Sequence, residues 1–343
     1  NKKINVFGWA STAWLGGGSG SGGVSGVNTD LLAALTAYGV AYNTELTDMY
    51  KDFQDGREYT RTLNAWPEQS GRLYEPDINN QTYYTQSMLD NAKSFSDTAD
   101  ACLIAGLSGS EGATAVPEVL WGDREPSGRT ADTWAYDLTT AASYANAGME
   151  GVGKYSAADG LYPADGTTNG NLDTPYTYEQ VSYVDYAEGI YIGYKWYETA
   201  DAEGYWDAES NEHGTGYDAV VQYPFGYGLS YTSFDWSDFK ADWSGDTCTA
   251  QVTVTNTGDV SGKDVVEVYV QSPYTDYDKT NGVEKPAVEL VGYGKTAELA
   301  PGASETVSVT FTKDQLKAYD ANGAKTYIPG CRGLLHHRSQ GRP

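Results

Sequence analysis

The second half of the chain is dominated by segments in which apolar and polar residues alternate with a period of two. The alternation runs through four segments rich in β-branched residues, which are Thr249–Thr255, Asp264–Gln271, Ala287–Leu290 and Glu305–Phe311. Strands that bury one face show this period, and the turn sequences Gly258-Asp259 and Pro301-Gly302 separate the runs. We therefore predict a small antiparallel β-sandwich, with a domain break within Gly228–Asp246.

The beginning of the chain has a different pattern. Short apolar runs alternate with segments in which apolar residues recur with the period of a helix. The predicted strands are Ile4–Trp9, Val40–Asn43 and Ala101–Leu107. A helix that carries Leu31, Leu32, Leu35 and Tyr38 is expected to begin at Asn28 or Thr29 and to end at Gly39. Further helices are predicted over Gln86–Asp97 and Ala113–Leu120. Strand, helix and strand in succession predict a parallel α/β layer.

Charge and composition narrow the function classes. The chain has 343 residues and a net charge of −25, so nucleic acid and anionic membrane surfaces are poor partners. No apolar run approaches the roughly 20 residues that a membrane-spanning helix needs. A neutral partner such as a sugar carries no electrostatic penalty, and the 29 Tyr and 9 Trp residues suit carbohydrate faces.

Cysteine and histidine are too sparse for a disulfide framework or a metal centre. The chain has three of each, namely Cys102, Cys248, Cys331, His213, His336 and His337. No Cys-x-x-Cys pair occurs, and the three histidines form no zinc-type spacing. We expect no metal and no cofactor.

Several motifs in one order resemble glycoside hydrolase family 3. The first is the glycine-serine loop Gly17–Gly22, and the second is Gly109-Ser110-Glu111-Gly112 followed by Glu118–Arg129, which contains Pro126-Ser127-Gly128-Arg129. Further matching segments are Glu188–Tyr194, Pro224–Tyr231, Val254–Lys263 and Leu299–Gly302. The resemblance implies a truncated flavodoxin-like α/β sandwich domain followed by a fibronectin type III-like (immunoglobulin-like) β-sandwich.

The same resemblance implies a function. Members of the family are mostly exo-acting β-glucosidases and β-xylosidases that retain anomeric configuration, which requires two carboxyl groups about 5–5.5 Å apart. In the family, the nucleophile is an Asp on a (β/α)8 barrel, and no stretch of this chain is long enough for such a barrel of about 250 residues. The expected partners are therefore a β-linked oligosaccharide or aryl glycoside and a barrel domain of the same parent protein. The chain alone is expected to be inactive.

Neither catalytic carboxylate is plainly present. The family's acid/base loop precedes a strand like Ala101–Leu107, whereas here Asp97–Asp100 runs straight into it, so we infer an internal deletion near residues 98–102. Glu111 is a weak catalytic candidate, and the simpler interpretation is a carboxylate that satisfies backbone N–H groups at a helix start. Asp238 follows Ser237 as in the family's nucleophile motif, but we interpret it as a surface linker residue.

The candidate substrate-binding residues gather around the glycine-serine loop. They are Trp14, as an aromatic wall of the leaving-group subsite, and the loop residues Gly18, Ser19, Gly20 and Ser21. The same glycines also fit a dinucleotide-binding fingerprint, with Glu45 near the position of a ribose-binding acid, although Ala10–Leu15 separates them from the strand. A carbohydrate-binding or structural domain pair without catalysis is the alternative to an enzyme.

We expect four segments along the chain. They are an α/β domain over 1–140, a linking excursion over 141–235, the β-sandwich over 236–330 and an unrelated tail over 331–343. The residues from Arg332 can be encoded by codons that also specify a second sequence when the reading frame is shifted by one base. That shifted frame encodes Gly-Asp-Tyr-Tyr-Ile-Thr-Ala-Ala-Lys-Asp-Ala, which resembles the last strand of the family's β-sandwich. The tail thus indicates a frameshift near Cys331 that deprives the sandwich of its closing strand and leaves Leu334 and Leu335 without a designed partner.

Two expectations concern the parent protein. Most relatives place the barrel before the α/β domain, but Val6–Thr12 looks more like the minority with the reversed order. We also expect a bacterial protein that is secreted or held at the cell surface.

Overall fold

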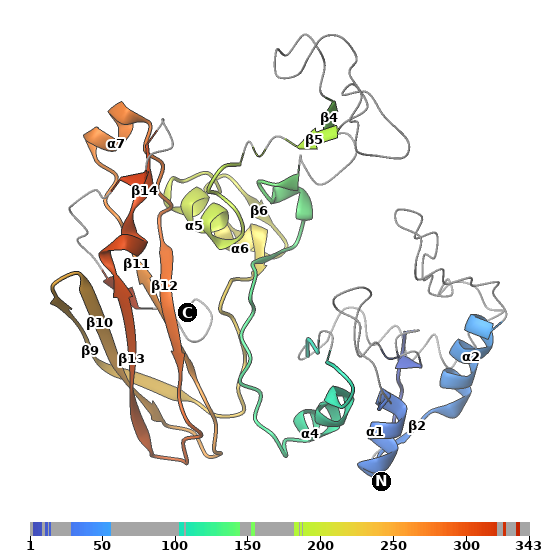
Figure 1. The fold of residues 1–343 in the computed structure, drawn as a ribbon. Coiled ribbons are helices and arrows are strands. Elements are labelled where there is room, and N and C mark those ends of the chain that lie inside the picture. Colours follow the sequence, from blue (N-terminus) through green and yellow to red (C-terminus); the bar gives the residue numbers. More distant parts are fainter. Residues whose placement is uncertain are drawn as a thin grey trace, which may run out of the picture. The chain divides into compact units, whose positions relative to one another are not determined.

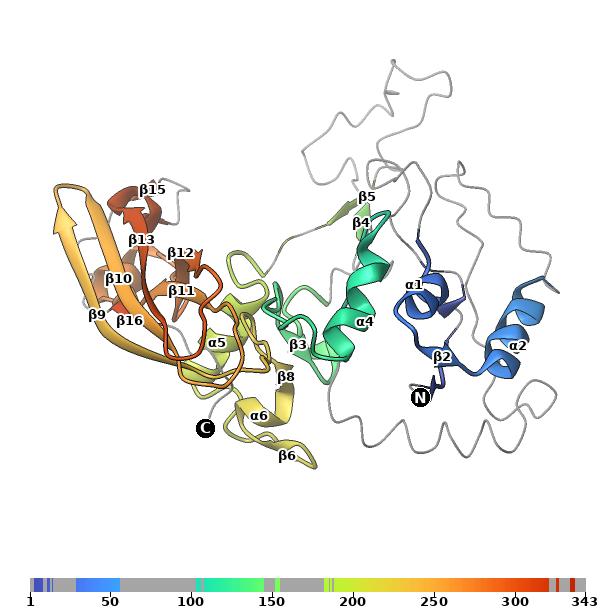
Figure 2. The same ribbon diagram turned by 90° about the horizontal axis from the view of Figure 1, so that it is seen from below.

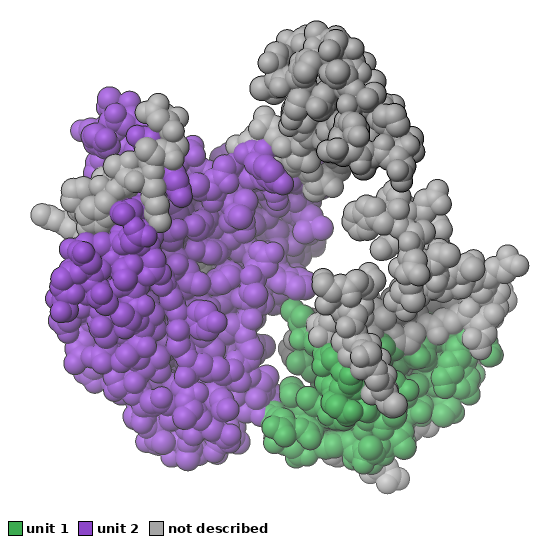
Figure 3. Space-filling model, in the orientation of Figure 1, with its two compact units in different colours: residues 1–124 green, residues 125–343 purple. Residues whose placement is uncertain are grey.

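The protein is described here by a computed structural model that covers residues 3–8, 11–12, 14, 29–55, 103–105, 108–144, 152–154, 182–184, 186, 188–320, 325–326 and 334–336. The chain divides into two compact units, Asn1–Arg124 and Glu125–Pro343, which Figure 3 colours separately. Each unit contains its own buried apolar clusters.

The first unit is built on a short parallel sheet. Strand β1 (Lys3–Ile4) pairs in parallel with β2 (Ala41–Tyr42), and helix α1 (Leu31–Ala37) connects them. Leu32 and Leu35 of α1 are buried against this sheet region, together with Val40. The predicted parallel order of strand, helix and strand is confirmed, with α1 and β2 labelled in Figure 1. Of the predicted strand Ile4–Trp9, however, only Ile4 lies in β1, because Asn5–Gly8 belong to no strand.

Helix α1 begins one residue later than the sequence suggested. Its N-cap is Asp30, whose carboxylate accepts a hydrogen bond from the backbone N–H of Ala33 at 2.6 Å, and neither Asn28 nor Thr29 is the cap. Asp is as good a cap as Asn and better than Thr, so sequence alone did not separate the three positions. The helix is followed by Gly39 at a φ of 82°, as predicted for its end.

Two further helical segments lie among the described residues of the first unit. Helix α2 (Thr44–Asp55) buries Leu46 and Tyr50 against Phe7, and a 3₁₀ turn, η3 (Gly112–Thr114), leads into α4 (Ala115–Leu120). The helix predicted over 113–120 is therefore confirmed. The helix predicted over Gln86–Asp97 lies outside the described residues.

The predicted third strand is wrong where the structure describes it. Leu103, Ile104 and Ala105 belong to no strand, and the side chains of Leu103 and Ile104 are 43% and 52% exposed. A run of apolar residues favours a buried strand only if a neighbouring strand accepts its backbone hydrogen bonds. Among the described residues, no strand pairs with these three.

The second unit starts with small elements that precede the sandwich. Helix α5 (Tyr194–Ala202) and the short α6 (Tyr217–Val220) enclose an aromatic cluster in which Tyr197, Trp206 and Tyr217 are buried. The other elements are the turn η4 (Leu138–Thr140) and the strands β3 (Trp134–Ala135), β4 (Val152–Lys154), β5 (Ser182–Val184), β6 (Ser210–Asn211), β7 (Gly214–Thr215) and β8 (Val221–Tyr223).

The rest of the unit is the predicted antiparallel β-sandwich. One sheet has the strand order β13-β10-β9 and the other the order β12-β11-β16; Figure 2 labels these strands. Valines that alternate along β10 and β13 are buried with Phe311 and Cys248 between the sheets, and Cys248 is a free thiol. The strands are β9 (Phe234–Ser244), β10 (Thr247–Asn256), β11 (Val265–Val270), β12 (Glu289–Lys295), β13 (Ser304–Thr312) and β16 (Leu334–His336). The remaining elements are α7 (Asp276–Asn281), the turn η9 (Lys313–Leu316) and the pair β14 (Ala318–Tyr319) and β15 (Lys325–Thr326).

The interpretation of Asp238 as a linker residue is wrong, because it lies inside the 11-residue strand β9. The register of β9 on β10 shifts between Gln251 and Thr253, so Asp238 and Phe239 oppose a single residue, which is a β-bulge. Asp238 has a φ of 54° and an exposed side chain. The bulge and the acidic residues of β9 disturb the alternation that revealed the other strands.

The tail contributes a strand, contrary to the expectation that Leu334 and Leu335 have no partner. β16 pairs antiparallel with β11, and Leu334, Leu335 and His336 lie opposite Val270, Tyr269 and Val268 (Figure 2). An unpaired edge of β11 accepts any extended backbone of suitable position, because ladder hydrogen bonds do not depend on side chains. The frameshift itself stays a prediction.

Restoring the shifted reading frame is expected to stabilise the sandwich. The restored sequence alternates over more residues than β16 has, so more cross-strand pairs form with β11, each contributing about 0.2–1 kcal/mol. We expect an unfolding midpoint several degrees above that of this chain, measured by calorimetry (on the order of 2–4 °C per kcal/mol). A chain that ends at Gly330 is the control. A restored chain that melts no higher than this truncation contradicts the prediction, as does a resequenced gene that does not encode Gly-Asp-Tyr-Tyr in the shifted frame.

Candidate functional site

The candidate substrate-binding residue Trp14 is held by a loop from the other side of the first unit. Its ring is half-buried, and its Nε1–H donates to Ser108 Oγ at 3.2 Å. Ser108 lies 94 positions further along the chain, so the contact depends on the fold of the unit and not on local sequence. The hydrogen bond fixes one edge of the indole and leaves the ring as a partly exposed aromatic surface.

The loop that carries Ser108 is in turn anchored beside helix α1. The backbone N–H of Thr29 donates to Ser110 O at 2.8 Å, and its hydroxyl donates to Glu111 Oε2 at 3.1 Å. The turn tolerates no side chain at Gly112, because a Cβ there would lie 2.3 Å from Ser108 Cβ. These hydrogen bonds therefore bring Trp14 to the loop that carries Ser108 and Glu111, and they anchor that loop beside the start of α1.

Glu111 does not cap the helix that follows it. It is the residue before η3, but its side chain makes no capping hydrogen bond, and the exposed carboxylate accepts the Thr29 hydroxyl instead. The prediction that it satisfies backbone N–H groups is therefore wrong. The reason is geometric, since its φ of −118° and ψ of −6° differ from the extended conformation of a good N-cap. A catalytic role for Glu111 stays untested.

The other predicted binding residues divide into described and undescribed positions. Gly18, Ser19, Gly20 and Ser21 lie outside the described residues, so their role stays a prediction. Glu45, the acid of the dinucleotide alternative, lies exposed in the first turn of α2. A carboxylate there interacts favourably with the helix dipole, so a structural role accounts for it.

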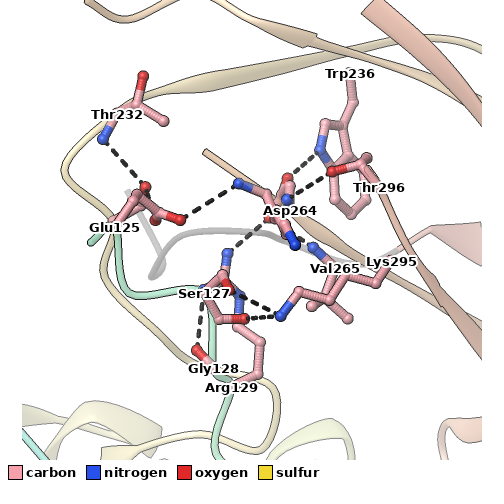
Figure 4. A network of polar contacts seen from close by, with 12 residues as sticks. Glu125, Ser127, Gly128, Arg129, Thr232, Trp236, Asp264, Val265, Lys295 and Thr296 are labelled. Atoms are coloured by element: carbon pink, nitrogen blue, oxygen red, sulfur yellow. Dashed lines mark hydrogen bonds and ion pairs between the residues drawn. The ribbon is translucent and has the colours of Figure 1, made fainter. Parts of the chain in front are cut away.

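The Pro126–Arg129 motif belongs to a buried polar network on the sandwich (Figure 4). Arg129 forms an ion pair with Asp264 at 2.7 Å, and the two side chains are 7% and 0% exposed. The Asp264 carboxylate also accepts hydrogen bonds from Trp236 Nε1 at 2.8 Å and from the Val265 N–H at 2.9 Å. A buried carboxylate needs several such donors, so the motif anchors its segment to the start of β11.

The Pro224–Tyr231 motif forms a turn that the same segment holds. Thr130 exchanges backbone hydrogen bonds with Gly226 and Tyr227, and its hydroxyl donates to Pro224 O at 2.6 Å. Glu125, in front of this segment, accepts hydrogen bonds from the Ser230 hydroxyl and from the Lys263 N–H. These motifs are thus structural within the second unit.

Helix α5 is fastened to the sandwich by Tyr194, its first residue. Its hydroxyl accepts the Leu290 N–H at 2.9 Å, and its ring meets Tyr269 edge-on with centroids 5.9 Å apart. The neighbouring Lys195 pairs with Glu289 of β12 at 2.7 Å. Tyr194 and Lys195 therefore fasten α5 to one sheet.

Glu267 is a buried carboxyl group whose titration affects stability. Burial raises the pKa of Glu267. Two interactions partly oppose this shift: the Tyr269 hydroxyl donates to Oε2 at 2.7 Å, and the charge of Arg129 favours the carboxylate. The folded state therefore favours the protonated form. Its stabilising contribution is complete below the ordinary pKa of about 4.5 and is lost as pH rises through the raised pKa.

We expect Glu267→Gln to remove this loss. The variant should be more stable than the parent chain at neutral pH, and the difference should shrink toward pH 4, as measured by urea unfolding across the range. The exposed Glu298 gives the control Glu298→Gln, which should leave the pH dependence unchanged. A Glu267→Gln profile parallel to that of the parent chain contradicts the assignment.

Sequence reasoning did not find Ser108 or Thr29, which hold Trp14 and Glu111. Neither belongs to a motif with its own chemistry, and both act through contacts between segments far apart in the chain. The only sequence signal is the position of Ser108 directly before the Gly109–Gly112 motif. At Gly109 the backbone turns with a φ of 73°.

Comparison with known proteins identifies both domains. Residues 82–194 match the model of the glycosyl hydrolase family 3 C-terminal domain, and residues 264–332 match that of a fibronectin type III-like domain. The second match ends at Arg332, close to the position inferred for the frameshift.

The curated relatives are much longer than this chain. Beta-glucosidase A of Butyrivibrio fibrisolvens is 32% identical over 242 residues, which cover 66% of this chain and 23% of the relative. Thermostable beta-glucosidase B of Acetivibrio thermocellus is 27% identical over 276 residues, which cover 78% of this chain and 29% of the relative. The matched region thus spans about a quarter of each relative.

Solved structures agree on the fold. Beta-glucosidase 3B from Thermotoga neapolitana, in complex with glucose, aligns with a TM-score of 0.65 at 21% identity over 99% of this chain and 50% of that one. The family 3 β-glucosidase of Bifidobacterium adolescentis aligns with a TM-score of 0.61 at 21% identity, over 98% of this chain and 49% of that one.

Proposed function

Because the chain contains the C-terminal domain of glycosyl hydrolase family 3 followed by a fibronectin type III-like domain, we propose that it is the non-barrel part of a retaining, exo-acting β-glycosidase. The substrate is a terminal, non-reducing β-linked sugar, with β-glucosides first and β-xylosides second. The observation that carries the proposal is the pair of family domains in family order, shared with curated β-glucosidases. The chain alone is inactive in this account.

The geometry around Trp14 is consistent with a secondary role of this residue in substrate binding. A half-buried indole held at one edge offers an apolar face against which a sugar or an aryl leaving group packs. The hydroxyls of Ser19 and Ser21 and the backbone of Gly18 and Gly20 are proposed to bind sugar hydroxyls. The nucleophile comes from a barrel domain of the parent protein, and the acid/base comes from the loop that we infer to be deleted near residues 98–102, with Glu111 as a minor candidate for that role.

The proposed reaction is tested on the intact parent protein, with its flanking reading frame and the segment that we infer to be missing near residues 98–102. Proton NMR should show the β-anomer of glucose as the first product of aryl β-glucoside hydrolysis, because retention uses two displacements. A β-xyloside should be cleaved with a lower kcat/KM. An α-anomer as the first product contradicts the retaining mechanism.

Replacing Trp14 with alanine in that parent protein is expected to raise KM for an aryl β-glucoside about tenfold, which corresponds to ~1.4 kcal/mol of lost binding. The reason is the loss of the aromatic wall, so kcat should change less than KM. Trp134, which is 45% exposed in the second unit, gives the matched control Trp134→Ala with an unchanged KM. Equal effects of the two substitutions on KM contradict the assignment of Trp14 to the subsite.

The location of the parent protein is part of the proposal. No helix among the described residues is long and apolar enough to cross a membrane. We place the parent protein in a bacterium, outside the cell or at its surface, where oligosaccharides with β-linked ends are available.

A further inference from the structure

Two lysines lie together on the sandwich of a strongly acidic chain. Lys295 ends β12, and Lys263 lies two residues before β11. Lys263 lies two residues before Val265, the register partner of Lys295, and its charge acts on the ammonium group of Lys295, so the two cations are near one another. The chain has only 22 basic residues and 47 acidic ones, so two neighbouring cations are unusual in it.

A serine hydroxyl joins this pair. Lys295 Nζ donates to Ser127 Oγ at 2.8 Å and to Ser127 O at 2.9 Å (Figure 4). Two of the three donor positions of the ammonium group are thereby directed at one residue. The Ser127 hydroxyl keeps its proton as a donor for a further acceptor, because it accepts from the lysine.

The nearby carboxylates are already engaged by other groups. Asp264 is buried and neutralised by Arg129, and Glu125 accepts the Ser230 hydroxyl and the Lys263 backbone N–H. Within the described part of the chain, neither lysine has a carboxylate within ion-pair distance. Burial is the main cause of the lowered pKa of Lys295; the charges of Lys263 and Arg129 lower it further, and those of Glu125 and Asp264 oppose them.

We propose that Lys263, Lys295 and the Ser127 hydroxyl form a binding site for a compact tetrahedral oxyanion, a phosphate or sulfate group. Two ammonium groups and one hydroxyl donor suit its several acceptor oxygens, and the anion offsets the repulsion between the lysines. The site lies on the fibronectin type III-like domain and its preceding segment. It is independent of the proposed glycosidase function.

The free ion and a phosphorylated sugar offer the same chemistry. Lys295 and the four charged groups that act on its pKa, which are Arg129, Lys263, Glu125 and Asp264, sum to one net positive charge. A site with that charge binds a compact oxyanion more tightly than chloride, because several hydrogen bonds add to the attraction. A measurement is needed to distinguish the free ion from the phosphorylated sugar as the ligand.

The test is isothermal titration of the intact chain with inorganic phosphate, with glucose 6-phosphate, and with sodium chloride at matched ionic strength. We expect saturable binding of phosphate that Lys263→Gln weakens at least fivefold. Lys263 is the chosen substitution because its side chain forms no hydrogen bond or ion pair with the described residues, whereas Lys295 holds Ser127. The control is Lys240→Gln, an exposed lysine of β9, which should bind phosphate as the parent chain does.

The outcomes separate the sources and decide the proposal. Tighter binding of glucose 6-phosphate than of phosphate identifies a sugar ester as the ligand, and equal or weaker binding identifies the free ion. Heat signals that match those of chloride overturn the site. Equal weakening by Lys263→Gln and Lys240→Gln also overturns it, because binding would then follow net charge alone.

Discussion

Replacing Arg129 with alanine is expected to destabilise the chain by about 3–5 kcal/mol, because it leaves a buried carboxylate without its counter-charge. Asp264 has no solvent-exposed surface, and its remaining donors are Trp236 Nε1 and the Val265 N–H. Two neutral donors do not compensate the desolvation of an ionised carboxyl group. The measurement is the free energy of unfolding in urea, followed by tryptophan fluorescence.

Arg124 provides a matched control from the same stretch of chain. It pairs with Glu118, but its side chain is 68% exposed, so solvent screens the interaction. Arg124→Ala should cost no more than about 1 kcal/mol. Equal losses for the two arginine substitutions would show that the Arg129 network contributes no more than a surface ion pair.

Replacing Gly226 with alanine is expected to cost about 2–4 kcal/mol through strain and overpacking together. Gly226 has a φ of 78°, and a Cβ there would lie 2.3 Å from Glu267 Oε2. The Glu267 carboxyl is buried and bonded to the Tyr269 hydroxyl, so it does not move aside without breaking that bond. Chemical denaturation at neutral pH measures the loss.

Gly302 separates the two causes, because its φ is also 78° while a Cβ there would meet no atom within 4 Å. Gly302→Ala therefore reports backbone strain alone, at about 1–2 kcal/mol. The excess cost of Gly226→Ala over Gly302→Ala is the cost of displacing Glu267. No excess would contradict the close packing of that turn on the carboxyl group.

The sandwich could be predicted from sequence because its strands alternate regularly. Thr249–Thr255 and Glu305–Phe311 lie within β10 and β13, and their inward residues form the core. Strand β9 was missed, since a bulge at Asp238 shifts its alternation by one residue. A bulge is fixed by the partner strand, which a single segment does not reveal.

The first domain was less predictable for a related reason. The pair β1 and β2 followed from two short apolar runs on either side of a helix, whereas the apolar run at Leu103–Ala105 forms no strand. Whether an apolar run becomes a strand depends on a neighbour that pairs with it.

The candidate site was predicted in part. The sequence singled out Trp14 and Glu111, but the hydrogen bonds that hold them, from Trp14 to Ser108 and from Thr29 to Glu111, join residues more than 80 positions apart. Side-chain capping by Glu111 was inferred from its place before a helix, and its backbone conformation excludes that role. Long-range contacts of this kind follow from the tertiary fold and not from local pattern.

The central claim is that this chain is the non-barrel part of a β-glycosidase. The most direct measurement is the hydrolysis of a chromogenic aryl β-glucoside by the chain alone and by the intact parent protein, which has the barrel domain and the segment that we infer to be missing near residues 98–102. The account predicts turnover by the intact parent protein and none by the chain alone, because retention needs two carboxyl groups and the account places them on the barrel domain and on the missing segment. Hydrolysis by the isolated chain, or none by the intact parent protein, would contradict it.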